Sequence, residues 1–446
     1  MPISVSVGVP APRLFRRFRL AGLFLGPIFL LTACGTEPAE TTASKPAKGA
    51  KSTTATAEAP AATEAAPLHV SVFLEYSGGM KGFVPRGAAG TPATEFQKRI
   101  GALITETQVS PVVAERRFYL CENAAPKAVK FEQVRNLVQG NETHAALGTE
   151  LPQMLEGILR QPKAAQEVSV IISDFIYGPE DGSAFSQLPN LIQTSMLPVS
   201  QRQLAVAVFG ETSRFYGSYF PAVKRPVPKR ILKGEKVPYY VWIIGPPVQV
   251  ARYTAEVFRN APAQQAFFGL KTSAPAFAPL LTKLTDPKLK PVGSVWSDNE
   301  GLHIKPASDE PLDFYVALAL GGLPAAWQQP AFLAQHLQVR LPNGQASLLP
   351  NPVRALTSIE QEGQPVLAPY THLLHLRVSK LGTDNPLSIS LPAPETPDWV
   401  SAWSTTNDNM PAAHTFGLDQ ILAGVRQSYP TPLPAVFTVQ LPLKKD

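Results

Sequence analysis

The sequence is poor in cysteine and in charge. Its 446 residues contain two cysteines, Cys34 and Cys121, and only 17% charged residues. Two cysteines cannot form the set of disulfides that holds together many small secreted domains. The net charge is +6, but the first 33 residues contain four arginines and no acid, and without them 36 basic residues face 34 acidic ones. This near balance excludes a nucleic-acid-binding protein that depends on bulk positive charge.

Several motifs of common enzymes are also missing. No Gly-rich loop ends in Lys-Ser or Lys-Thr, so the chain has no P-loop. The hydrolase signature Gly-x-Ser-x-Gly is absent as well. The 46 prolines, roughly twice the usual share of about 5%, favour strands and turns over long surface helices. The hydrophobic content of 44% in so long a chain predicts a substantial core and two or three domains.

The N-terminal segment has the pattern of a targeting signal. Arginines precede an apolar run from Leu20 to Leu31, which is too short to span a bilayer of about 30 Å. The run ends in Leu31-Thr32-Ala33-Cys34, which resembles the lipobox of bacterial lipoproteins. The resemblance implies that residues 1–33 are a signal peptide and that Cys34 carries acyl chains such as palmitate. The protein would then be anchored to a membrane of the bacterial cell envelope. An ordinary secretory signal with an incidental cysteine is the alternative.

Residues 34–67 have the composition of a disordered tether. After Cys34 they consist almost entirely of Ala, Thr, Pro, Glu, Lys and Ser, with nothing large and apolar to bury. A flexible segment of this length has a root-mean-square reach on the order of 30 Å. We therefore expect the folded part to stand off the membrane.

Residues 68–262 alternate between predicted strands and helices. Strands buried on both faces are predicted from continuous apolar runs, which are typical of a parallel sheet covered by helices: His69 to Leu74, Val168 to Ile172, Leu204 to Phe209 and Tyr239 to Ile244, with a shorter run from Arg117 to Cys121. Helical spacing appears between them, for example at Leu151, Met154, Leu155 and Ile158. This alternation predicts a doubly wound α/β domain.

Residues 263–446 contain short strands separated by Pro, Gly, Asn and Asp turns. Leu337-Gln338-Val339-Arg340-Leu341 alternates apolar with polar residues, as expected for a sheet with one solvated face. We predict a mainly β, sandwich-like domain with one helix near its C-terminus, at Leu418 to Val425.

In a doubly wound sheet, ligands bind outside the carboxyl ends of the strands. The first strand runs into Glu75-Tyr76-Ser77-Gly78-Gly79-Met80. This stretch resembles the first loop of the von Willebrand factor type A (vWA) fold, whose pattern is Asp-x-Ser-x-Ser. The family binds Mg²⁺ or Mn²⁺ there, in a metal-ion-dependent adhesion site completed by a threonine and by an aspartate after the fourth strand. Hydroxyl and carboxylate oxygens suit such hard cations.

The resemblance implies a degenerate site in this chain. Glu75 replaces the family's aspartate, Ser77 matches the first serine, and Gly79 replaces the second. The threonine would be Thr149 and the aspartate Asp174. Mg²⁺ tolerates water ligands, so the loss of one hydroxyl would weaken the site without abolishing it. The alternative is structural: Ser77 and the glycines form a turn, Thr149 caps a helix, and Asp174 anchors a loop.

A second candidate surface lies in the long link from Glu211 to Val237. It combines aromatic with basic residues, which are common in binding surfaces. With Lys81, the candidate partner-binding residues are Phe215, Tyr216, Tyr219, Arg225, Lys229 and Arg230. The alternative is a solvated hairpin whose lysines protect an edge and whose aromatics cover the sheet.

The sequence therefore predicts an envelope lipoprotein that binds a protein partner through the top face of a vWA-like domain, without catalysis. The resemblance implies that an acidic side chain of the partner completes the coordination of the metal. One rival is an envelope hydrolase that uses Glu75 and Asp174 as a carboxylate pair. Another is a purely structural module of an envelope complex.

Overall fold

The computed structural model describes residues 66–86, 92–122, 125–141, 150–161, 167–178, 182–223, 228–280, 294–298, 301–305, 311–409 and 413–445. The predicted signal peptide, Cys34, Thr149 and Arg225 lie outside these ranges. Within them, no helix combines the length and the apolar character needed to cross a membrane.

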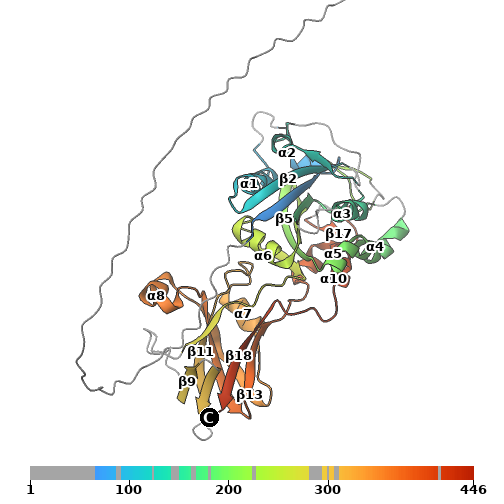
Figure 1. The fold of residues 1–446 in the computed structure, drawn as a ribbon. Coiled ribbons are helices and arrows are strands. Elements are labelled where there is room, and N and C mark those ends of the chain that lie inside the picture. The colour runs from blue at the N-terminus through green and yellow to red at the C-terminus, as the bar shows by residue number, and fades with distance from the viewer. Residues whose placement is uncertain are drawn as a thin grey trace, which may run out of the picture. The chain divides into compact units, whose positions relative to one another are not determined.

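A seven-stranded mixed sheet lies in the first part of the chain (Figure 1). Its strands are β1 (Leu68–Glu75), β2 (Val113–Cys121), β3 (Lys127–Val129), β4 (Val168–Ser173), β5 (Ala205–Tyr219), β6 (Arg230–Gly245) and β7 (Gln264–Phe268). The order across the sheet is β3-β2-β1-β4-β6-β5-β7. β1 is parallel to β2 and to β4, whereas β6 is antiparallel to β4 and to β5.

The sequence predicts the strands of this sheet better than their directions. Each of the five apolar runs lies mostly within one strand. The expectation of an all-parallel arrangement is wrong for β6, because β5 continues to Tyr219 and the chain returns directly as β6. A hairpin return makes two strands antiparallel, and a continuous apolar run indicates burial on both faces but not direction.

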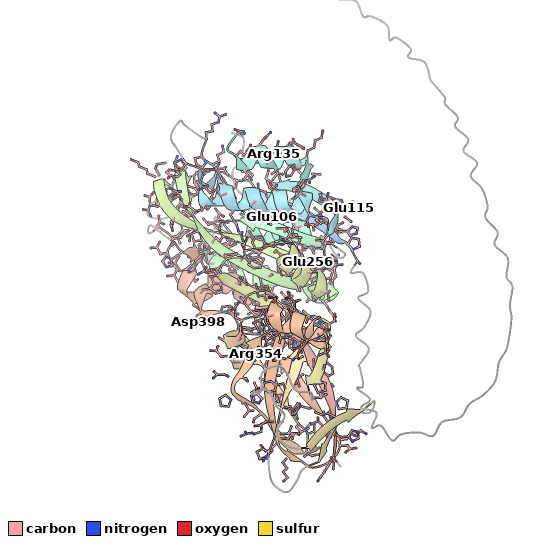
Figure 2. The ribbon with its side chains drawn as sticks, turned by 90° about the vertical axis from the view of Figure 1, so that its left-hand side faces the viewer. Glu106, Glu115, Arg135, Glu256, Arg354 and Asp398 are labelled. Atoms are coloured by element: carbon pink, nitrogen blue, oxygen red, sulfur yellow. The ribbon has the colours of Figure 1, made fainter. Side chains whose placement is uncertain are left out.

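Helices cover both faces of the sheet. One face packs against α1 (Glu95–Val109), α2 (Phe131–Val138) and α6 (Pro247–Glu256). Figure 2 labels one residue on each of these helices, Glu106, Arg135 and Glu256. The opposite face packs against α3 (Leu151–Leu159), α4 (Leu188–Ser195), α5 (Leu197–Arg202), α9 (Asp398–Trp403) and α10 (Leu418–Gln427). Short 3₁₀ helices are η1 (Met80–Phe83) and η2 (Gly182–Gln187). The predicted doubly wound arrangement of helices is therefore present.

Local sequence explains where helix α1 begins. Thr94 precedes it, and its Oγ1 accepts a hydrogen bond of 3.1 Å from the backbone N–H of Gln97. The Gln97 side chain accepts in return from the backbone N–H of Thr94, at 3.0 Å. This capping box satisfies two donors that a helix start leaves free.

The β-rich part contains two larger sheets. A five-stranded sheet has the order β12-β15-β18-β10-β9, and a four-stranded sheet the order β13-β14-β11-β8. Apolar residues of both sheets belong to one buried cluster, as in a sandwich. The elements here are β8 (Phe277–Leu280), β9 (Ser294–Asp298), β10 (Gly301–Lys305), β11 (Leu312–Leu318), α7 (Pro330–His336), β12 (Gln338–Arg340), β13 (Gly344–Ala355), α8 (Ser358–Gly363), η4 (Pro365–Leu367), β14 (His372–Leu381), β15 (Asn385–Leu391) and β18 (Phe437–Lys445).

The α/β unit continues beyond the predicted boundary at residue 262. Strand β7 pairs with β5 in the first sheet. Residues 398–427, which contain α9, β16 (Ser404–Thr405), β17 (Thr415–Phe416) and α10, return from the β-rich part to the same unit. We call residues 398–427 the return segment. Helix α10 buries Leu418, Ile421, Leu422 and Val425 in the cluster that contains Leu188 and Ile192 of α4.

Candidate functional site at the carboxyl edge of the sheet

The turn after β1 is compact and partly buried. The backbone N–H of Tyr76 donates to the carbonyl oxygen of Cys121 at 3.2 Å, which extends the pairing of β1 with β2. The N–H of Met80 donates to the carbonyl of Ser77 at 3.1 Å, which closes the turn before η1. Gly79 has φ −64° and ψ −35°, which any L-residue adopts. A glycine is therefore not required at this position by the backbone.

Two predicted site residues converge beside this glycine. A Cβ atom built on Gly79 would lie 3.4 Å from Ser77 Oγ and 3.4 Å from Asp174 Oδ2. Ser77 is 5% exposed, and its hydroxyl makes no hydrogen bond with any described residue. The Ser77 hydroxyl therefore has lone pairs that a ligand at this point could use.

The loop after β4 fixes the two carboxylates. The hydroxyl of Ser173 donates to Glu75 Oε2, and the N–H of Phe175 donates to Ser173 Oγ at 2.9 Å. The N–H of Ile176 donates to Asp174 Oδ1 at 3.0 Å, which leaves Oδ2 facing the first turn. Phe175 has φ +54°, an uncommon conformation for a bulky residue. Such strained conformations concentrate at functional sites.

Burial and like charge dominate the electrostatics of this edge. The pKa of Asp174 is raised well above its usual value, first by burial and then by the charges of Glu75 and Asp408. Burial likewise raises the pKa of Asp408. Neither aspartate forms an ion pair with a described residue. The two aspartates therefore lie close together without an ion pair to any residue that the structure describes.

Asp408 joins the site from the return segment and was not predicted from the sequence. It is fully buried and accepts hydrogen bonds from the backbone N–H groups of Ala222 at 2.6 Å and Val223 at 3.1 Å. The hydroxyl of Tyr219 donates to it at 3.4 Å. Burial, and then the charges of Asp408 and Asp174, raise the pKa of Tyr219. These hydrogen bonds connect the end of β5 to the return segment, beside Asp174.

The remaining predicted residues divide into exposed and buried ones. Lys81 and Lys229 are exposed, and Tyr216 and Arg230 are half-buried. Phe215 and Tyr219 are 0% and 4% exposed, because they pack under η1 and the return segment, so they cannot contact a partner. The prediction that these two aromatics bind a partner is therefore wrong. Thr149 lies outside the described residues. Burial, and then the charge of its neighbour Glu150, raise the pKa of Tyr177.

The oxygen donors of this edge fit a hard divalent cation. Ser77 Oγ and Asp174 Oδ2 face the same point, and both carry lone pairs that no described donor uses. Mg²⁺ and Mn²⁺ prefer such hydroxyl and carboxylate oxygens and accept water at other positions. No set of three or more His, Cys, Asp or Glu side chains suited to a metal occurs among the described residues. Protein ligation would therefore rest on one carboxylate, one hydroxyl and water.

Comparison with known proteins gives no further assignment. No protein-family model matches the chain, and no curated protein or solved structure matches it either.

Proposed function

We propose that the chain is a lipid-anchored protein of the bacterial cell envelope whose α/β unit binds a protein partner. In this proposal the unit is a divergent vWA domain, and the partner docks on the carboxyl edge formed by the turn after β1 and the loop after β4. The observation that carries the proposal is the convergence of Ser77 Oγ and Asp174 Oδ2 beside Gly79. Both oxygens can ligate a cation without the loss of a hydrogen bond to a described residue.

A divalent cation at this point would supply positive charge to which an acidic side chain of the partner binds. Ser77 and Asp174 would contact it. Glu75 is held by Ser173 and would add negative charge behind it. Binding would also remove the electrostatic penalty that Asp174 carries when ionised, because an opposite charge favours the ionised carboxylate.

The proposed anchor is tested on Cys34 itself. β1 begins at Leu68, at the opposite end of the strand from Glu75 and Ser77. Mass spectrometry of the envelope-extracted protein is expected to show acyl chains on Cys34, and an unmodified Cys34 would remove the lipoprotein part of the proposal.

Gly79→Ser is the sharpest test of the ion site. The backbone accepts serine, and a hydroxyl there would join Ser77 and Asp174 as a third oxygen donor. We expect isothermal titration to show Mn²⁺ and Mg²⁺ binding in the natural chain and about tenfold tighter binding in Gly79→Ser, because one ordered ligand replaces water. Asp174→Asn should abolish the binding.

Gly322→Ser is the matched control, because a Cβ there meets nothing within 4 Å. It should leave the titration unchanged. If neither the natural chain nor Gly79→Ser binds either ion at millimolar concentration, the ion-dependent mechanism is refuted.

A hydrolase is the second candidate, and one observation favours it. The pKa of Asp174 is raised, partly by its neighbour Glu75, and a carboxyl pair with separated pKa values can act as acid and base. This version predicts turnover on a panel of glycan and phosphoester substrates that Glu75→Gln reduces at least a hundredfold. Absence of turnover by the natural chain would exclude it on those substrates.

A further inference from the structure

The hairpin of β5 and β6 extends beyond the rest of its sheet. β7 pairs with β5 only from Val206 to Gly210, and β4 pairs with β6 only from Tyr240 to Ile244. Among the residues that the structure describes, no further strand therefore pairs with the hairpin between Thr212–Pro238 and Tyr219–Arg230. This part of the hairpin is a two-stranded ribbon, and it belongs to the long light-green strands in Figure 2.

The ribbon has two chemically different faces. Phe215, Tyr219, Leu232 and Val237 are buried and make up the inner face. Tyr216 pairs with Lys233 and Ser218 with Ile231, so these four residues share the opposite face. We call this the outer face, and with it we group the neighbouring exposed residues Phe220, Lys229 and Lys236.

The outer face carries more positive than negative charge. Lys229, Lys233 and Lys236 are exposed, and none of them forms an ion pair with a described residue. The acid among them, Glu235, accepts a hydrogen bond from the backbone N–H of Lys233, and this bond and then the charges of Arg230 and Lys233 lower its pKa. One carboxylate thus stands against three lysines.

The charges that remain available are lysines rather than arginines. Arg214 is paired with Glu95, and Arg230 donates to the carbonyl oxygen of Asn409. Arginine recognises a carboxylate or phosphate through a fixed fork, whereas a lysine ammonium is a hydrated point charge without directional demand. Three free lysines suit a surface that presents many anionic groups at once better than a single shaped acidic ligand.

Apolar side chains lie among these lysines. Ile231 is 59% exposed and Phe220 is 38% exposed. Peripheral segments that bind membranes combine Lys or Arg with exposed bulky apolar residues, which enter the headgroup region.

We propose that the outer face of this hairpin binds the anionic headgroups of a lipid bilayer. The lysines are attracted to the negative surface, and Ile231 and Phe220 enter the interface. This binding depends neither on an ion at Ser77 and Asp174 nor on acylation of Cys34, so it stands or falls separately from the proposed function.

Vesicle co-sedimentation of the full chain tests the proposal. Vesicles of phosphatidylglycerol and phosphatidylcholine are compared with vesicles of phosphatidylcholine alone, at about 0.15 M salt, where charges are screened beyond about 8 Å. The triple variant Lys229→Ser/Lys233→Ser/Lys236→Ser should bind the anionic vesicles about tenfold or more weakly than the natural chain. Ile231→Ser should weaken binding a few-fold. Because every protein carries the same N-terminal segment, these differences report on the hairpin.

Lys98→Ser/Lys127→Ser/Lys380→Ser is the matched control. It removes three exposed lysines from α1, β3 and β14 and should leave vesicle binding within about twofold of the natural chain, since loss of net charge alone is a minor effect at this salt concentration. Unchanged melting temperatures will show that the variants are folded. Equal binding of the hairpin variant and the natural chain overturns the proposal. It is also overturned if the triple substitution weakens binding to polyglutamate but not to anionic vesicles, since the partner would then be an acidic polypeptide.

Discussion

The two ends of the central sheet treat buried acids in opposite ways. At the amino end of β4, Glu167 is 6% exposed, forms an ion pair with Arg117 and accepts a hydrogen bond of 2.8 Å from Ser71 Oγ. At the carboxyl end, Asp174 is 5% exposed and forms no ion pair with a described residue, while Glu75 and Asp408 raise its pKa further. The two carboxylates are thus equally buried, but of the two only Glu167 is paired with a described cation. The first arrangement stabilises the fold, and the second is the one to which the proposed cation would bind.

Loss of Arg117, which neutralises Glu167 at the amino end of β4, should have the largest effect on the free energy of unfolding. Arg117→Met leaves Glu167 buried without its cation, and we expect a loss of about 3 kcal/mol in the free energy of unfolding. Urea denaturation at pH 7 measures it. Arg160→Met is the control, because Arg160 pairs with Glu156 on an exposed helix surface and should cost less than about 0.5 kcal/mol. Equal losses in the two variants would mean that the Arg117–Glu167 ion pair stabilises the fold no more than an exposed ion pair does.

Removal of the carboxylate of Asp174 at the carboxyl end should instead increase the free energy of unfolding. Asp174→Asn keeps an oxygen that can accept from Ile176, and it removes an unneutralised charge. We expect a gain of about 1–2 kcal/mol at pH 7 in the absence of divalent ions. Urea denaturation with and without Mn²⁺ measures it. A clear loss of stability would show that Asp174 is structural.

The pH dependence of this gain gives an independent check. The pKa of Asp174 is higher in the folded state than its unfolded value of about 3.9. Its protonation therefore stabilises the fold fully below about pH 4, and this contribution is lost as the pH rises through the folded pKa. The stability difference between Asp174→Asn and the natural chain should thus be small near pH 4 and grow toward pH 7. A difference that stays constant over this range would contradict the raised pKa.

Of Arg117, Asp174 and Lys81, substitution of Lys81 should change the free energy of unfolding least. It lies in η1, next to the site, and it is exposed. If it supplied the missing counter-charge, its removal would destabilise the chain as Arg117→Met does. We expect Lys81→Ala to change the free energy of unfolding by less than about 0.5 kcal/mol, as for most surface substitutions. A loss above 1 kcal/mol would show that the carboxyl end is neutralised after all.

The sequence predicts what depends on local pattern. The strands follow from apolar runs, and the positions of Ser77 and Asp174 follow from the rule that neighbouring parallel strands end at one edge. Helix α10 was predicted from its apolar spacing. Its place beside α4 was not, because amphipathic spacing identifies a buried face and not the surface that covers it.

Asp408 could not be found in the same way. Its partners are the backbone N–H groups of Ala222 and Val223, and a backbone donor leaves no mark in the sequence. The only local signal is the polar run Thr405-Thr406-Asn407-Asp408-Asn409 after Trp403, which is equally typical of an ordinary loop. The buried state of Tyr219 depends on the same long-range contact, and that of Phe215 on its packing against Phe83 of η1.

The return segment has a consequence for how the molecule is made. Because α10 completes the apolar covering of α4, the α/β unit cannot close until residue 427 has left the ribosome. Its unfinished face would stay open while the β-rich part is being synthesised. Gly424 fits closely against α4, since a Cβ there would lie 2.5 Å from the carbonyl oxygen of Pro189. A chain truncated before residue 398 would thus keep the apolar side of α4 exposed and would be prone to aggregate.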